Sequence, residues 1–286
     1  MSGESVDVSI KITDHEFELI RKIMYERTGV FLRDTKKTLV VARLRKRLLH
    51  LGLTNFGQYI ALLKSHDKKE VETFINAITT NETNFFRHPK QFEFLMSRIL
   101  PDLRSTKTRT GQKSLRFWSA ACATGEEPYT IAMLCREFFK DDPSWSISIY
   151  ASDINSEVLA FAQQGVYTSR SLRELPDKYF KKYFQKQDID TGHGKEERYK
   201  IADDIMRGVQ FRQHNLLTPF IVDQVDVVFF RNAMIYFDDV SKREVLKRIY
   251  HNMASYGYVF ISLAENLPYR DALFEFIGMG IYRRIG

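Results

Sequence analysis

The sequence predicts an α/β protein with a doubly wound parallel sheet, preceded by a small all-helical module. Residues 14–79 carry apolar side chains at helical spacing and lack strand-like alternation. Beyond them, short apolar strands alternate with helices, which is the pattern of a parallel sheet with crossover helices. The chain of 286 residues exceeds the usual size of one domain. We therefore expect a helical domain at 1–80 and a sheet domain at 81–286.

The helical module should contain four helices. Asp14 is the expected N-cap of the first, which should stop at Gly29. The second, near residues 36–51, places leucines on one face and basic residues, among them Arg43 and Arg47, on another. Two shorter helices are expected over residues 55–64 and 69–78.

The sheet domain begins with a βαβα run and continues with three more strands. The first strands are expected at 115–121 and 146–152, and their helices at 128–139 and 156–164. Later strands are expected at 209–213, 225–230 and 257–262, with a helix at 241–253 and a terminal hairpin within 274–286. Residues 165–208 form an insertion, which we interpret as a small antiparallel β unit because so long a bare loop is unusual.

Charge and cysteine content restrict the kinds of partner, metal site and cellular location that we expect. A net charge of +7 predicts an acidic partner, and residues 35–66 hold seven Lys or Arg and no Asp or Glu. The two cysteines, Cys122 and Cys135, fit neither a structural disulfide nor a zinc site, so no metal is expected. The amino terminus has no long apolar run, which predicts no signal peptide, no spanning helix and a cytoplasmic location.

Ligands of doubly wound sheets bind at the carboxyl ends of the strands. The first turn there runs from Ala121, a candidate cofactor contact, to Pro128, and its small residues let a ligand approach the backbone. It lacks the three spaced glycines of a dinucleotide site, and Glu126 and Glu127 disfavour a pyrophosphate. Asp153 ends the second strand, where carboxylates bind ribose hydroxyls. S-adenosylmethionine, with ribose hydroxyls, a positive sulfonium and no phosphate, suits these carboxylates.

Ordinary structural roles compete with this interpretation. Glu126 and Glu127 could be first-turn carboxylates that favour the helix dipole, and Asp153 could be a helix cap. Arg231 and Asn232 follow an apolar strand directly. Because a buried unpaired guanidinium is costly, these two residues favour a functional role.

Five stretches resemble the CheR family of chemotaxis-receptor methyltransferases. In chain order they are TTNETNFFRHPKQFEFL (79–95), FWSAACATGEEPYTIAML (117–134), IYASDINSEVLAFAQQGVY (149–167), HNLL (214–217) and DVVFFRNAMIYFD (226–238). Together with the helical module they cover nearly the whole chain. The resemblance implies a class I S-adenosylmethionine-dependent methyltransferase fold. It also implies an enzyme that methylates glutamate side chains of chemoreceptors and releases S-adenosylhomocysteine.

The resemblance also implies roles for individual residues. Asn81, Thr83 and Arg87 match positions near the methionyl and methyl-transfer end, and Glu127 and Asp153 match positions that hold the adenosyl group. The other matches are Asn215 and Leu216 near the adenine, and Arg231, Asn232 and Tyr236 at the strand end that finishes the pocket. Without the resemblance, residues 81–87 would be interpreted as a capped linker turn.

A glutamate acceptor is already ionised at pH 7, so no general base is required. Catalysis should come from positioning and partial desolvation, and we expect Arg87 and Tyr236 to orient the carboxylate or the methyl donor. Arg43 and Arg47 are expected to dock on the acidic cytoplasmic part of the receptor. A merely solvated basic face is the alternative.

The chain departs from the family pattern in two places. Phe230 stands where the family usually has cysteine, and Leu263-Ala264-Glu265-Asn266 replaces a His-Ser-Glu-Asn stretch, which bears on activity and substrate fit. Two other functions stay open: a non-catalytic S-adenosylmethionine-binding sensor or scaffold, and an RNA methyltransferase that binds phosphates with the basic module. Few aromatics interleave the basic stretch, so nucleic acid is not the expected partner.

Overall fold

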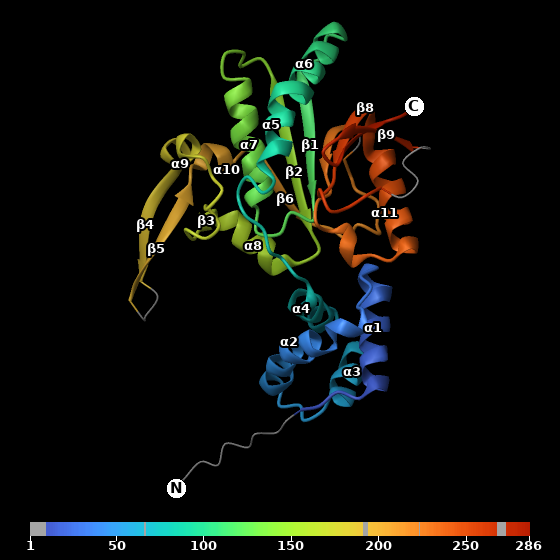
Figure 1. The fold of residues 1–286 in the computed structure, drawn as a ribbon. Helices are drawn as coiled ribbons and strands as arrows, with labels where there is room; N and C mark the ends of the chain where they lie inside the picture. Colours follow the sequence, from blue (N-terminus) through green and yellow to red (C-terminus); the bar gives the residue numbers. More distant parts are fainter. Residues whose placement is uncertain (1–9, 66, 191–193, 223, 268–272) are drawn as a thin grey trace. The chain divides into compact units, whose positions relative to one another are not determined.

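The computed structural model describes residues 10–65, 67–190, 194–222, 224–267 and 273–286. The expectations for the extreme amino terminus (1–9) and for part of the insertion (191–193) lie outside these residues. The chain divides into two compact units (Figure 1). One consists of Met1–Thr80 with Tyr236–Ser241, and the other of Asn81–Ile235 with Lys242–Gly286.

The first unit is helical, as its apolar spacing predicted. Helix α1 (Asp14–Thr28) is capped by Thr13, one residue before the predicted Asp14. The Thr13 side chain accepts the N–H of Glu16, and the Glu16 carboxylate accepts the N–H of Thr13, so two donors of the first turn are satisfied. Gly29 ends the helix at φ 73°, which glycine adopts without strain. The other helices are α2 (Lys37–His50), α3 (Phe56–Lys64) and α4 (Lys68–Ile78).

The apolar face of α2 builds the core of this unit. Val40, Leu44 and Leu48 are fully buried, whereas Leu51, predicted on the same face, is half-buried just past the helix end. Burial of such a side chain contributes roughly 1.5 to 3 kcal/mol, so this face stabilises the helix far more than its intrinsic propensity does.

The second unit contains the predicted sheet. Its strand order is β6-β2-β1-β7-β8-β10-β9 (Figure 1), with five parallel strands and an antiparallel hairpin at one edge. The chain thus moves outward from β1 in both directions, which is the doubly wound arrangement. The strands are β1 (Ser114–Ala120), β2 (Ser146–Asp153), β6 (Val209–Gln213), β7 (Val225–Phe229), β8 (Met253–Phe260), β9 (Phe274–Gly278) and β10 (Ile281–Arg284).

The helices of this unit include a stretch that was not predicted. The run from Pro89 to Arg109 is helical and buries Phe92, Leu95 and Leu103 in the core. Proline is tolerated in the first turn of a helix, so Pro89 begins this run and does not break it. The helices are α5 (Pro89–Phe94), a π-helical segment (Leu95–Ile99), α6 (Leu100–Arg109), α7 (Glu126–Phe138), α8 (Ser156–Gln164), α9 (Asp177–Tyr183), α10 (Asp203–Met206) and α11 (Asp239–Asn252).

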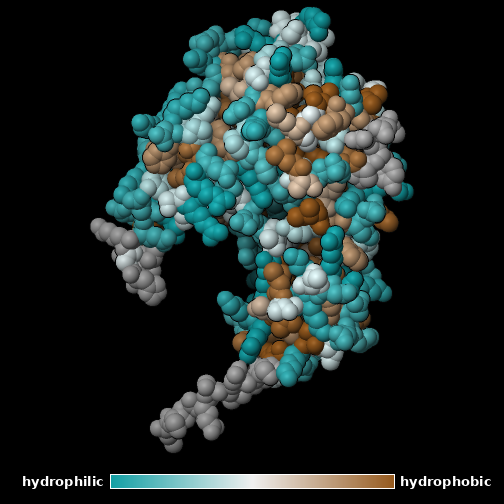
Figure 2. Space-filling view, viewed as in Figure 1, coloured by the Kyte–Doolittle hydropathy of each residue, from teal (hydrophilic) through white to brown (hydrophobic). Residues whose placement is uncertain are grey.

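The insertion is a three-stranded antiparallel sheet, as predicted. Its order is β3-β5-β4, and it lies beside α9 and α10 (Figure 1). The strands are β3 (Val166–Tyr167), β4 (Phe184–Asp190) and β5 (Lys195–Ile201). Hydrophilic residues cover most of the face seen in Figure 2, with hydrophobic ones between them. None of the helices in the described part of the chain combines the length and apolar character needed to cross a membrane.

Candidate functional site

The carboxyl ends of β1, β2, β6 and β7 meet at one edge of the sheet because these strands are parallel. The backbone is strained at this edge. Ala121 and Ala123 in the turn after β1, and Asn232 after β7, have φ values of 62°, 47° and 58°. A non-glycine residue in the left-handed region costs about 1 to 3 kcal/mol and is typical of functional sites. The strained residues therefore lie at the same edge of the sheet at which the sequence predicts ligand binding.

Asp153 joins the ends of the first two strands. Its carboxylate accepts the N–H of Ala123 at 2.9 Å and the N–H of Asn155 at 2.9 Å. Asn155, and not Asp153, caps α8, because its side chain accepts the N–H groups of Glu157 and Val158. Burial raises the pKa of Asp153, and the backbone hydrogen bonds oppose that rise. The alternative of Asp153 as a helix cap is therefore wrong.

Glu127 and Arg231 form a buried ion pair. Nε of Arg231 donates to Oε2 of Glu127 at 2.6 Å, and the Ser119 hydroxyl donates to Oε1 at 2.6 Å. The guanidinium also lies over the Phe92 ring, 4.9 Å from its centroid. Glu127 thus neutralises a charge that would be costly to bury alone, a larger role than favouring a helix dipole.

Gln91 organises the other side of Arg231 and was missed in the sequence. Nη1 of Arg231 donates to the Arg87 carbonyl at 2.6 Å and to Oε1 of Gln91 at 3.0 Å. Nε2 of Gln91 donates to the carbonyls of Ile261 at 2.8 Å and Met279 at 2.6 Å. The side chain is fully buried. A glutamine among apolar residues at helical spacing was the only signal for it.

Glu265 holds the loop after β7. Oε2 accepts the N–H groups of Asn232 at 3.1 Å and Ser262 at 2.9 Å, and Oε1 accepts that of Ile235 at 3.3 Å. Burial raises the pKa of this carboxyl. Within this stretch the two residues that differ from the family pattern, Leu263 and Ala264, are exposed, whereas the other departure, Phe230, is fully buried. The glutamate that positions Asn232 is thus retained.

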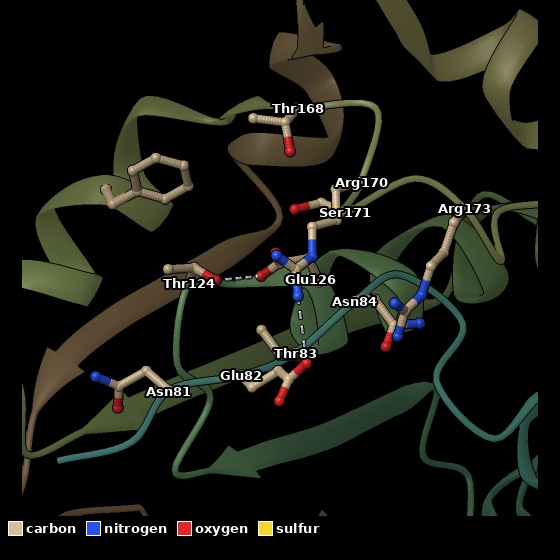
Figure 3. A pocket seen from close by; sticks show the side chains of 11 residues that line it. Asn81, Glu82, Thr83, Asn84, Thr124, Glu126, Thr168, Arg170, Ser171 and Arg173 are labelled. Carbon is tan, nitrogen blue, oxygen red and sulfur yellow. Dashed lines mark hydrogen bonds and ion pairs between the residues drawn. The ribbon is translucent and has the colours of Figure 1, made fainter. Parts of the chain in front are cut away.

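A cavity of about 240 Å³ lies next to the turn after β1 (Figure 3). Its lining comes from the segment before α5, from the turn itself, from α8 and from the segment after β3. The Glu126 carboxylate is buried there and accepts the Thr124 hydroxyl at 2.6 Å, and burial raises its pKa. The lining residues are Asn81, Glu82, Thr83, Asn84, Thr124, Glu126, Phe161, Thr168, Arg170, Ser171 and Arg173.

The structure brings only some of the predicted site residues together. Asn81 and Thr83 line the cavity, whereas the Arg87 side chain folds back and donates to the Glu82 carbonyl at 2.8 Å. The residues next to Arg87, Phe86 and His88, also have left-handed backbones, with φ values of 56° and 63°. This segment is a strained turn, not a relaxed linker.

Asn215, Leu216 and Tyr236 are not among the residues that line this cavity. Asn215 and Leu216 are half-buried after β6, where Oδ1 of Asn215 accepts the N–H of Leu217 at 3.0 Å. Tyr236 belongs to the helical unit, in which its carbonyl accepts the N–H of Phe31 at 2.8 Å. A role for Tyr236 at the site therefore stays a prediction.

Arg43 and Arg47 have partners inside the helical unit. Nε of Arg47 donates at 3.0 Å to Glu70, which is 4% exposed. Arg43 donates to the carbonyls of Ile78 at 2.5 Å and Thr79 at 2.9 Å, at the end of α4. Both guanidiniums thus stabilise this unit, a task that the basic pattern did not reveal.

Comparison with known proteins decides the family. The model described as CheR methyltransferase, SAM binding domain, matches residues 81–283, and the one described as CheR methyltransferase, all-alpha domain, matches residues 15–79. The chain belongs to the CheR methyltransferase family. It is similar to chemotaxis protein methyltransferase 2 of Vibrio cholerae, with 34% identity over 93% of this chain and 90% of that protein. The Escherichia coli chemotaxis protein methyltransferase is 34% identical over 96% and 92%, and that of Borreliella burgdorferi 33% over 97% of each.

The sheet edge of this CheR domain suits S-adenosylmethionine chemically. Asp153 ends β2, the position at which carboxylates of such folds bind ribose hydroxyls. The first turn carries Glu126 and Glu127 where a phosphate-bearing cofactor would need unopposed N–H donors. Gly125 has φ 93°, and a Cβ there would lie 2.8 Å from that of Ala162, so the tight turn against α8 requires glycine. The match to the SAM binding domain confirms the expected cofactor, S-adenosylmethionine, and the acidic first turn is chemically compatible with it.

Proposed function

We propose that this CheR methyltransferase transfers methyl groups to glutamate side chains on the cytoplasmic part of chemoreceptors. The product would be a glutamyl methyl ester used in chemotactic adaptation. The names of the relatives support the chemotactic role. The structural observation that supports this acceptor is that the carboxylates of Asp153, Glu127 and Glu265 all accept hydrogen bonds within the fold. Because these carboxylates are engaged and not free to act as a general base, the site favours an acceptor that needs none. A glutamate side chain is such an acceptor, since it is already ionised at pH 7.

The proposed mechanism relies on positioning. S-adenosylmethionine, when bound, supplies a methyl group on a positively charged sulfur. The chain holds the cofactor and orients the acceptor carboxylate, with Arg87 and Tyr236 as the orienting residues. Correct orientation and exclusion of water can each contribute several kcal/mol, on the order of the values found for well-oriented reactants. Proposed cofactor contacts are Asn81, Thr83, Arg87, Ala121, Glu127, Asp153, Asn215, Leu216, Arg231 and Asn232.

Two measurements test this function. Calorimetric titration with S-adenosylhomocysteine should show binding, and radiolabelled S-adenosylmethionine should label a receptor cytoplasmic fragment. The label should be released by mild base, because a methyl ester hydrolyses and a methylated amine does not. Binding without transfer would favour a sensor or scaffold, and labelling of RNA would favour an RNA methyltransferase.

Arg87→Ala and Tyr236→Phe should each lower turnover, and full turnover of both variants with normal cofactor binding would contradict their assignment.

The basic face of α2 is the proposed receptor-docking surface. Because Arg43 and Arg47 are tied into their own unit, charge reversal there would also disturb the fold. Lys46 is exposed on the same helix and gives a cleaner test. Lys46→Glu should raise the KM for the receptor fragment about threefold at low salt and less at high salt, with an unchanged melting temperature. An unchanged KM at low salt would leave this face merely solvated.

A further inference from the structure

The cavity beside the first turn carries positive charge that the proposed cofactor contacts do not use. Arg170 and Arg173 both line it, three residues apart in the segment between β3 and α9 (Figure 3). Their side chains are 81% and 52% exposed. Neither is buried by the core, so both guanidiniums are accessible to a partner.

The present partners of these arginines are weak. Nη2 of Arg170 lies 3.8 Å from Oε1 of Glu82, whose side chain is 72% exposed, and the two side chains point toward one another (Figure 3). Nε of Arg173 lies 3.7 Å from Oε1 of its neighbour Glu174. Exposed ion pairs of this kind contribute little to stability. An incoming carboxylate can therefore replace Glu82 or Glu174 at little cost.

The same cavity touches the segment proposed to hold the methyl donor. Asn81 and Thr83 line it, and the N–H of Phe85 donates to the Ser171 carbonyl at 3.0 Å. This bond ties the arginine-bearing segment to the residues that precede α5. The buried Glu126 carboxylate accepts the Thr124 hydroxyl, and burial raises its pKa, which disfavours a negative charge on Glu126 beside the two guanidiniums. A ligand held by the arginines would lie next to the donor segment.

We propose that Arg170 and Arg173 bind a carboxylate of the substrate protein and thereby set its affinity. A guanidinium presents paired N–H donors that match a carboxylate, which makes arginine the suitable residue for this task. A substrate with methylatable glutamates brings such carboxylates with it. The inference rests on the proposed glutamate methyl transfer and names the residues that select its substrate.

Steady-state methylation of a receptor cytoplasmic fragment tests the proposal. Arg170→Gln with Arg173→Gln should raise the KM for the fragment about tenfold, with kcat and the Kd of S-adenosylhomocysteine within about twofold of wild type. Glu82→Gln frees Arg170 from its internal partner and should lower the KM about twofold. Arg109→Gln, on the exposed end of α6, removes one positive charge elsewhere and should change none of these values. Added salt should raise the wild-type KM more steeply than that of the double variant.

The outcomes separate this inference from the proposed function. A wild-type KM in the double variant would overturn the inference alone. An equal rise in the Arg109→Gln variant would reduce the effect to net charge, and a parallel loss of S-adenosylhomocysteine binding would assign the arginines to the cofactor; either result overturns the inference. A wild-type protein that binds S-adenosylhomocysteine but methylates no receptor fragment would overturn the proposed function, and the inference with it.

Discussion

Strand β7 has a buried ion pair near each end, and the two pairs differ in what they connect. Near its start, Nζ of Lys107 lies 2.8 Å from Oδ1 of Asp226, and the two side chains are 7% and 0% exposed. Beyond its other end, Arg231 pairs with Glu127 at 2.6 Å, with side chains 3% and 11% exposed. Each pair joins one basic and one acidic side chain, and both pairs are buried.

The surroundings distinguish the structural pair at Lys107 from the Arg231 pair, for which a functional role is proposed. Asp226 also accepts the N–H of Arg116 at 2.8 Å, so the first pair fastens α6 to the amino end of the sheet. Arg231 reaches the Arg87 carbonyl and Gln91, and the next residue, Asn232, has a left-handed backbone. A buried ion pair is therefore no evidence of a site by itself. Its links to strained segments at the carboxyl edge are what indicate function.

The largest expected effect comes from Arg231→Met. It leaves the Glu127 charge buried without its partner, so the free energy of unfolding should fall by about 3 to 5 kcal/mol. The affinity for S-adenosylhomocysteine should fall about a hundredfold, since Arg231 also holds the Arg87 turn. Denaturant unfolding and calorimetric titration measure the two quantities. A wild-type affinity for S-adenosylhomocysteine in this variant would contradict the functional role proposed for the Arg231 pair.

Lys107→Met is the matched change at the other end. The unpaired Asp226 should lower the free energy of unfolding by about 3 kcal/mol, again measured by denaturant unfolding. S-adenosylhomocysteine affinity, titrated well below the melting temperature, should stay within about twofold of wild type. A loss of affinity comparable to that of Arg231→Met would contradict the structural role of this pair.

Gln91→Met sharpens the comparison with a smaller effect. The substitution keeps side-chain volume but removes the acceptor for Arg231 and the donors to Ile261 and Met279, which should cost about 1 to 3 kcal/mol of unfolding free energy. S-adenosylhomocysteine should bind about tenfold more weakly. The second consequence distinguishes a positioning residue from a merely stabilising one, because Lys107→Met should show only the first.

The smallest effect concerns pH. Burial raises the pKa of both Asp153 and Asp226 above the ordinary aspartate value. In the proposed cofactor contact the ionised form of Asp153 accepts ribose hydroxyls, so S-adenosylhomocysteine affinity should fall with decreasing pH, beginning at a higher pH than for an ordinary aspartate. For stability the sign is opposite: a raised folded-state pKa contributes most below the unfolded-state pKa, and that contribution is lost as pH rises. Asp153→Asn should flatten the affinity profile, whereas Asp226→Asn should leave its shape unchanged.

Elements with a clear local pattern could be predicted closely. Helix α8 (Ser156–Gln164) and strand β6 (Val209–Gln213) have the bounds that apolar periodicity and turn residues indicated. The helical run from Pro89 to Arg109 was missed because polar residues and two prolines interrupt its apolar spacing. Cap residues shifted by one position, from Asp14 to Thr13, since both residue types favour the same role.

The sequence by itself determined the order of strands and helices and the resemblance to the CheR family. It also determined that the first turn is acidic, which disfavours a phosphate-bearing cofactor. Only the tertiary structure decided which polar side chains meet. Glu127 and Arg231 lie 104 positions apart, and Gln91 reaches a carbonyl 188 positions away. Apolar periodicity reports which face of an element is buried, but a buried polar group takes its partner from whichever distant segment the fold brings within hydrogen-bond reach. For the same reason the basic pattern of α2 could not show that Arg43 and Arg47 are engaged within their own unit.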